Sequence, residues 1–198
     1  MKKTILVLAA NPVDTSPLRL DEEIREITNG LRRASMRDDF VLQPVLAARP
    51  EDVRRAMLDH KPAIVHFCGH GAQNSGIAFE GQSGESVLVT AEALSGFFKL
   101  FAEQVHCVVL NACYSEVQAE AIAEHIDHVV GMHGQIDDAK AVKFAVAFYD
   151  ALGAGREVEF AYDLALNATA WEQDGNALTP ILKGSTRSSQ AQKINTSH

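Results

Sequence analysis

Two short segments end in side chains that could act together as a nucleophile and a base. The first, V-H-F-C-G-H-G at residues 65–71, ends with His70 between two glycines. The second, V-L-N-A-C-Y-S at residues 109–115, places Cys113 directly after an apolar run. A cysteine becomes a strong nucleophile when a nearby base takes its proton. If the two runs are neighbouring parallel strands, imidazole and thiol meet at the carboxyl ends of the strands, where open α/β sheets build their sites.

The residues beside this pair favour a reactive thiol. Ser115 can cap a helix and Gln118 follows three residues later, a spacing typical of a capping box. Cys113 is therefore predicted to lie just ahead of a helix N-terminus, whose positive end favours a thiolate and whose N–H groups can hold an oxyanion. Glycines on both sides of His70 allow a sharp turn and the close approach of a substrate.

Each residue also has a plain structural interpretation. Cys113 taken alone is equally well explained as a small buried residue in a strand-to-helix turn. His70 taken alone could be a turn histidine bonded to a carbonyl group. The two residues together favour the catalytic interpretation, because a thiol and a base at matching points of two strands form a pair that can react.

A zinc site is the competing chemistry. His66, Cys68 and His70 alternate along the chain, which would place all three on one face of a strand. No fourth ligand and no C-x-x-C motif accompany them, so we expect no metal and no cofactor, with Cys68 and Cys107 as core residues. A phosphate-binding loop is also disfavoured, because neither G-x-G-x-x-G nor G-x-x-x-x-G-K follows the first apolar run.

The composition is typical of one soluble globular domain. The chain has 198 residues, 46% of them hydrophobic, and a formal net charge of −8; this charge argues against a general nucleic-acid surface, because phosphates would be repelled. The three cysteines show no paired spacing, so we expect reduced thiols and a cytoplasmic location. Residues 1–10 resemble a short signal peptide, but Asn11 and Pro12 follow, and a buried first strand is the better interpretation. No apolar run reaches the length of a membrane span, and no membrane partner is expected.

Apolar runs alternate with helical patterns, which predicts an α/β fold with a mostly parallel sheet and right-handed crossovers. The expected strands are residues 5–10, 40–46, 63–68, 105–110 and 128–132. The expected helices are residues 21–35, 50–60, 90–101, 117–125, 138–152 and 158–172. Most of the strand runs are continuously apolar, as in strands covered on both faces. Residues 72–89 are predicted to form a small hairpin beside His70 at the sheet edge, with short strands at 77–80 and 87–89.

Four segments resemble the CHAT family of caspase-like cysteine peptidases (clan CD). They are residues 8–27, 65–71, 110–115 and 129–155. The resemblance implies a caspase- or haemoglobinase-like three-layer α/β sandwich over residues 1–184, followed by a polar tail or linker at 185–198. It implies Cys113 as the nucleophile of a cysteine endopeptidase, His70 as the catalytic histidine, and the backbone amides of Gly71 and Cys113 as oxyanion donors.

The resemblance also bears on partners and control. It implies a regulated bacterial effector of the defence or cell-death type that cleaves a protein substrate after activation by a sensor or partner protein. The glycine-rich residues 76–84 beside His70 are the predicted mobile element of that control. The alternative hypothesis is a catalytically silent CHAT-type interaction module in a sensor or signalling assembly, although the intact His70 and Cys113 argue against it.

One position departs from the pattern of related peptidases that cleave after Lys or Arg. Those peptidases often carry Asp two residues before the cysteine, where this chain has the neutral Asn111. Because a neutral amide would leave a bound lysine uncompensated, we expect no strict preference for Lys or Arg, unless an aspartate elsewhere reaches the pocket. The candidate pocket residues are Arg19, Asp21 and Asn111, and the aspartates that could supply the charge are Asp14, Asp21, Asp137 and Asp138.

Overall fold

A computed structural model describes residues 2–72, 75–171 and 179–184. Its centre is a six-stranded sheet with the strand order β2-β1-β3-β6-β7-β8. The first five are parallel, and β8 runs antiparallel to β7. The strands are β1 (Lys3–Ala9), β2 (Phe40–Leu46), β3 (Ile64–Cys68), β6 (Cys107–Asn111), β7 (His128–Met132) and β8 (Pro180–Gly184).

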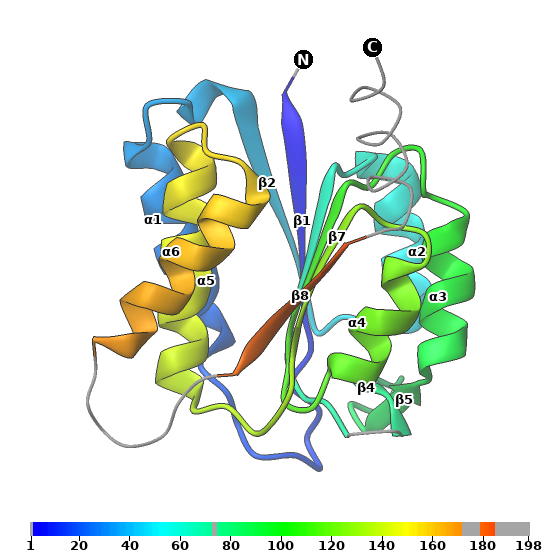
Figure 1. The fold of residues 1–198 in the computed structure, drawn as a ribbon. Coiled ribbons are helices and arrows are strands. Elements are labelled where there is room, and N and C mark those ends of the chain that lie inside the picture. The colour runs from blue at the N-terminus through cyan, green and yellow to red at the C-terminus, as the bar shows by residue number, and fades with distance from the viewer. Residues whose placement is uncertain (1, 73–74, 172–178, 185–198) are drawn as a thin grey trace.

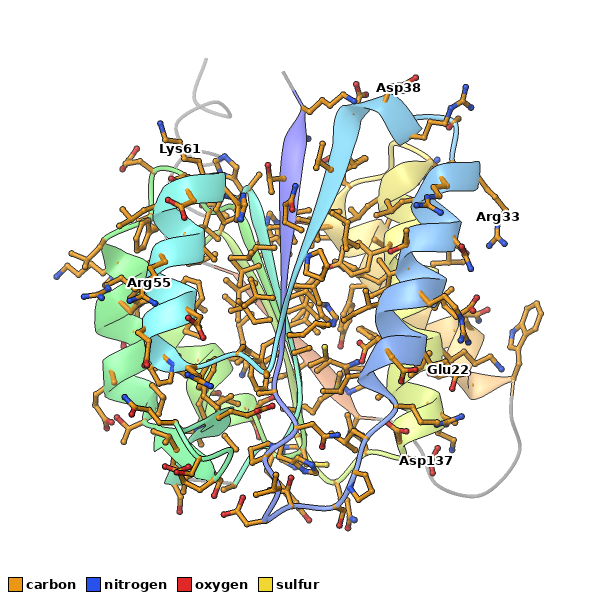
Figure 2. The ribbon with its side chains drawn as sticks, turned by 180° about the vertical axis from the view of Figure 1, so that it is seen from behind. Glu22, Arg33, Asp38, Arg55, Lys61 and Asp137 are labelled. Carbon is orange, nitrogen blue, oxygen red and sulfur yellow. The ribbon has the colours of Figure 1, made fainter. Side chains whose placement is uncertain are left out.

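Helices cover both faces of this sheet, which gives three layers (Figure 1). One face carries α1 (Leu20–Arg33), α5 (Asp138–Gly153) and α6 (Val158–Ala170), and the other carries α2 (Pro50–His60), α3 (Ala91–Lys99) and α4 (Glu116–Ala123). A short 3-10 turn, η1 (Arg37–Asp39), precedes β2. Charged side chains such as Arg33 on α1 and Arg55 on α2 point outward from these layers (Figure 2).

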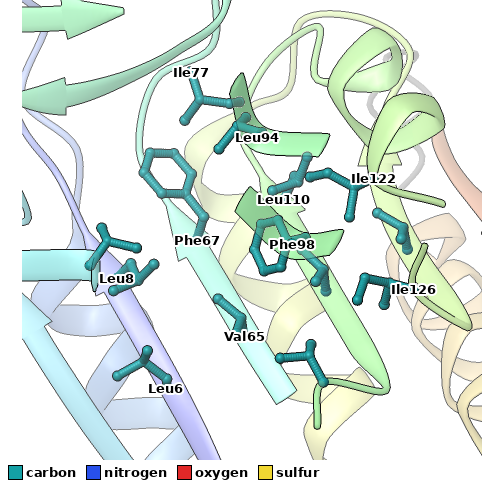
Figure 3. Packing of buried hydrophobic residues seen from close by; sticks show 14 of the residues in the cluster. Leu6, Leu8, Val65, Phe67, Ile77, Leu94, Phe98, Leu110, Ile122 and Ile126 are labelled. Atoms are coloured by element: carbon teal, nitrogen blue, oxygen red, sulfur yellow. The ribbon is translucent and has the colours of Figure 1, made fainter. Parts of the chain in front are cut away.

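The sheet separates two hydrophobic cores, because successive side chains of a strand point to opposite faces. In β3, Val65 and Phe67 pack under α3 and α4, whereas Ile64 and Cys68 pack under α1 and α5. Figure 3 shows the first core, in which Phe67 and Val65 lie near Leu110 of β6. All five residues of β3 are buried, and so are all five of β6. The continuous apolar runs of the sequence therefore correspond to strands covered on both faces, as predicted.

The predicted elements agree with the observed ones within a few residues, and α2 has the predicted bounds. The sequence analysis missed β8. This strand is only five residues long, begins with proline, and leaves four of its residues partly or fully exposed at the sheet edge, so it lacks the apolar run that marked the others. The predicted tail at 185–198 lies outside the described residues. No described helix combines the length and apolarity that crossing a bilayer requires.

The predicted hairpin is present as β4 (Ile77–Glu80) and β5 (Ser86–Val89), which pair antiparallel. It lies at the carboxyl ends of the parallel strands, close to α3 and α4 (Figure 1). The N–H of Ala78 donates to the carbonyl of His70 at 2.9 Å, and the N–H of Val13 donates to the carbonyl of Gly84 at 2.9 Å. The hairpin is thus fastened both to the histidine segment and to the loop after β1.

The segment predicted to be mobile, residues 76–84, has a buried part and a more exposed turn. Ile77, Ala78 and Phe79 are buried at 1–4% exposure, so we expect their amides to exchange slowly with deuterium. The turn at residues 81–84 is partly or fully exposed, and we expect it to exchange much faster, because exposed backbone with few apolar contacts opens at low cost. Hydrogen–deuterium exchange with β6 as the protected reference checks this. Fast exchange throughout β4 would instead support the whole segment as the mobile element.

Candidate active site

The strand register brings the two predicted catalytic residues to the same level. Strands β3 and β6 are parallel neighbours, and Cys68 pairs with Asn111 at their last positions. His70 and Cys113 each follow two residues later. A pocket of about 240 Å³ opens where these strands end. Its lining residues are Ser16, Leu18, Leu20, Glu23, Gly69, His70, Asn111, Cys113, Gln135, Ile136, Asp138 and Ala141.

His70 is half-buried, and the loop after β1 determines which of its nitrogens carries the proton. Its Nε2 lies 2.8 Å from the carbonyl oxygen of Ser16. A carbonyl can only accept a hydrogen bond, so Nε2 carries a proton and Nδ1 of the neutral ring is left unprotonated. The histidine is therefore held as the tautomer that can act as a base through Nδ1. The turn-histidine interpretation described this contact correctly, and the contact is compatible with catalysis.

Cys113 is half-buried in a sharp turn between β6 and α4. The N–H of Ile136 donates to its sulfur at 3.4 Å, which places a positive partial charge at the thiol. The next residue, Tyr114, has φ 53°, a left-handed conformation that non-glycine residues adopt at a cost of about 1–3 kcal/mol. The Tyr114 N–H donates to the carbonyl of Gly134 at 3.0 Å, which helps to hold the turn in place.

The histidine and cysteine segments are in direct backbone contact through Gly71. A Cβ atom on Gly71 would lie 2.0 Å from the carbonyl oxygen of Cys113. No side chain can occupy that space, so glycine is required for this close approach. The contact fixes His70 and Cys113 on adjoining segments at the mouth of the pocket.

The predicted capping box at the start of α4 is wrong. Ser115 is the N-cap residue, but its side chain makes no capping bond. It is fully buried, and its hydroxyl donates to the carbonyl of Leu110 at 3.1 Å and accepts from the N–H of Met132 at 3.0 Å. The polar atoms of the two strand ends need partners inside the protein, so Ser115 connects β6 to β7 and does not cap the helix.

The pocket contains an acid that the sequence analysis missed. Glu23 on α1 is 3% exposed, and its Oε1 accepts from His66 Nε2 at 2.8 Å and from Asn111 Nδ2 at 2.6 Å. Asn111 Nδ2 also donates to the carbonyl of Ala141 at 3.1 Å. The signal was present in the sequence, because Glu23 lies four residues before Ile27, on the apolar stripe of the helix.

The other residues predicted for the substrate pocket do not all line it. Asn111 lines the pocket, whereas Arg19 and Asp21 do not. Asp138 lines it as well, and its Oδ2 accepts from Arg19 Nε at 2.9 Å. The two remaining aspartates are used elsewhere: Asp14 accepts from the Ser86 N–H and hydroxyl, and Asp137 caps α5.

The possible metal ligands form a different group from the one considered in the sequence. Glu23, His66 and Cys68 have ligand atoms within 4.8 Å of one another, and His70 is not among them. Burial, and secondarily the Glu23 carboxylate, raises the pKa of the Cys68 thiol well above its usual value. A protonated sulfur is a poor metal ligand. Cys107 is also a core thiol, and burial raises its pKa to about 12.

Solved structures of cysteine proteases share this fold. The chain superposes on a secreted C11 cysteine protease from Bacteroides thetaiotaomicron with a TM-score of 0.67 and 15% identity, over 96% of this chain and 68% of that one. Gingipain R, an Arg-specific cysteine proteinase, superposes with a TM-score of 0.62 and 12% identity, over 92% of this chain and 46% of that one. The Drosophila initiator caspase Dronc superposes with a TM-score of 0.58 and 9% identity, over 91% of this chain and 79% of that one. The three-layer sandwich is therefore caspase-like.

Sequence relatives carry protease names and are much longer than this chain. One is a Roc-COR-CHAT protease from an unknown prokaryotic organism, 26% identical over 174 residues, which are 84% of this chain and 16% of that protein. Another is a probable protease of Gillisia limnaea, 23% identical over 170 residues, which are 84% of this chain and 30% of that protein. The chain spans less than a third of the length of either relative.

A match to a family model covers most of the chain and shows the family to which it belongs. The sequence model of the CHAT domain matches residues 4–170, from β1 to the end of α6. This range includes the histidine and cysteine segments and every parallel strand of the sheet. The chain belongs to the CHAT domain family.

Proposed function

We propose that this chain is a cysteine endopeptidase in which Cys113 and His70 form a catalytic dyad. The observation that carries the proposal is the geometry of the strand ends, where a tautomer-fixed histidine and a thiol adjoin one pocket. The fold shared with cysteine proteases and the protease names of the relatives support it.

The reaction follows from the groups at the pocket. His70 Nδ1 takes the proton of the Cys113 thiol, and the sulfur attacks the carbonyl carbon of a peptide bond. Within the described residues, neither the Gly71 N–H nor the Cys113 N–H donates to another backbone carbonyl, so both are available to hold the oxyanion. The imidazolium then protonates the leaving amine as the C–N bond breaks. Water hydrolyses the thioester, and the thiol is regenerated.

The setting is part of the same proposal. The described cysteines are all free thiols, which suits a reducing cytoplasm. The matching region is a minor part of both relatives, which supports control of such a domain by other sequence or by a partner protein. A regulated effector that cleaves a protein substrate in bacterial defence or cell death is the function we propose.

Alkylation kinetics test the dyad before any substrate is known. We expect Cys113 to react with iodoacetamide at pH 6 about tenfold faster in the folded protein than in the urea-unfolded chain, because an adjacent base and a donated N–H favour the thiolate. The measurement is peptide mapping by mass spectrometry over time. Cys68 and Cys107 are buried, with raised pKa values, and should remain unlabelled in the folded state.

The His70→Ala variant is the control for exposure. It leaves Cys113 at least as accessible but removes the base, so the folded-state rate should fall to that of the unfolded chain. Far-ultraviolet circular dichroism confirms that the variant is folded. Equal rates in the wild type and His70→Ala would show that accessibility alone governs labelling, and the dyad would be refuted.

A further inference from the structure

We propose that the pocket beside Cys113 accepts a lysine or arginine side chain from the residue before the cleaved bond, and that Glu23 selects it. This inference rests on the proposed peptidase function and names its substrate class. It differs from the expectation of a neutral pocket, which considered Asn111 and four aspartates but not Glu23.

The pocket has the position and size for one long side chain. It adjoins both His70 and Cys113, so a peptide with its carbonyl carbon at the sulfur has the preceding side chain within reach of the pocket. Its volume of about 240 Å³ accommodates a single extended residue. Leu18 and Ala141 in the wall provide apolar contact for an aliphatic stem, as long cationic side chains require. The lining contains no Lys or Arg among the described residues.

The hydrogen bonds to Glu23 leave its negative charge in place. Among the residues that the structure describes, His66 Nδ1 is buried with no hydrogen-bond partner, and a second ring proton there would be a buried donor without an acceptor. His66 is therefore neutral and donates through Nε2, and Asn111 donates a neutral amide.

Asn111 presents this acid to the pocket. Its Nδ2 donates to Glu23 and to the carbonyl of Ala141, so the amide anchors the carboxylate between α1 and α5. The second acid of the pocket, Asp138, is already paired with the guanidinium of Arg19. Glu23 is thus the acid best placed to compensate a substrate cation, and a buried carboxylate gains most from a charged partner that binds away from water.

Isosteric substrate pairs test the charge preference. Peptides that differ only in arginine versus citrulline, or lysine versus norleucine, before the cleaved bond keep the shape and remove the charge. We expect kcat/KM of the wild type to favour arginine over citrulline by at least about 100-fold. In Glu23→Gln, which keeps an acceptor for Asn111 and His66, the ratio should fall below about tenfold. Glu26→Gln, one turn along and paired with Arg25 outside the pocket, should keep the wild-type ratio.

A second readout needs no turnover. n-Butylguanidinium should slow iodoacetamide labelling of Cys113 at least about threefold in the wild type and in Glu26→Gln, but not in Glu23→Gln. n-Butanol is the neutral control and should protect none of them. If Glu23→Gln does not fold, the wild-type arginine-to-citrulline ratio and wild-type protection decide the question.

The outcomes separate the two proposals. Cleavage of citrulline peptides as fast as arginine peptides, abolished by Cys113→Ala, would leave a peptidase and overturn the basic pocket. A retained arginine preference in folded Glu23→Gln would overturn Glu23 as the selecting residue. If no peptide of either charge is cleaved and His70→Ala labels like the wild type, the peptidase function fails, and this inference fails with it.

Discussion

The Cys113→Ala variant is expected to cleave peptides at least about 10⁴-fold more slowly than the wild type, because the attacking atom is lost. No other thiol can replace it, since Cys68 and Cys107 are buried in the core between the sheet and helices α1 and α5 and their pKa values are raised. The measurement is kcat/KM on a peptide that the wild type cleaves. The midpoint of thermal unfolding should change little, because Cys113 is only half-buried.

The matched control is Cys107→Ala, at the first position of β6, the strand that precedes Cys113. It removes a buried sulfur at a cost of about 1 kcal/mol and should retain activity. The same pair distinguishes a peptidase from an interaction module. If Cys113→Ala keeps both partner binding and the full biological output, the interaction module is supported and the peptidase is not.

The Gly71→Ala variant is expected to lose about 100-fold in kcat/KM and about 2–4 kcal/mol in the free energy of unfolding. The added methyl would lie 2.0 Å from the carbonyl oxygen of Cys113, so either the histidine segment or the cysteine segment must move. A shift of about 1 Å is enough to misalign a nucleophile and its base. Urea unfolding and peptide turnover measure the two effects.

Gly96→Ala provides the control, with the same chemical change in open space. No heavy atom lies within 4 Å of a Cβ at Gly96, which is an exposed position inside α3. Alanine there should stabilise the protein by about 0.5–1 kcal/mol, because it lowers the backbone entropy of the unfolded chain. Full activity and normal stability in Gly71→Ala would show that the close approach of the two segments is not required.

The layers of the fold could be predicted because most of the parallel strands are continuous apolar runs and helical patterns separate them. Strand β8 could not, since an edge strand buries little and leaves a weak pattern. His70 and Cys113 could be paired because equal offsets from two strand ends imply equal height in a parallel sheet. Glu23 was not predicted as an acid of the pocket, because its hydrogen-bond partner Asn111 lies 88 positions away in the sequence.

The capping box is wrong and the interpretation of Asn111 was incomplete for the same physical reason. Ser115 and Gln118 have the spacing of a cap, but the hydroxyl instead satisfies the backbone of β6 and β7. Asn111 was interpreted as a neutral replacement for an acid, but the structure shows it holding an acid from another helix. In both cases the tertiary fold supplies a partner that the local pattern does not show.

The pocket is assembled from parts that are far apart in the sequence. Ser16 contacts His70, Glu23 contacts Asn111, and Ile136 contacts Cys113. A chain still emerging from the ribosome has neither the Ile136 N–H nor the Ala141 wall until both residues have been synthesised. The histidine and cysteine segments are complete earlier, but they have no finished pocket between them. On the proposed function, the order of synthesis thus delays an activated thiol until the residues that complete its pocket have been made.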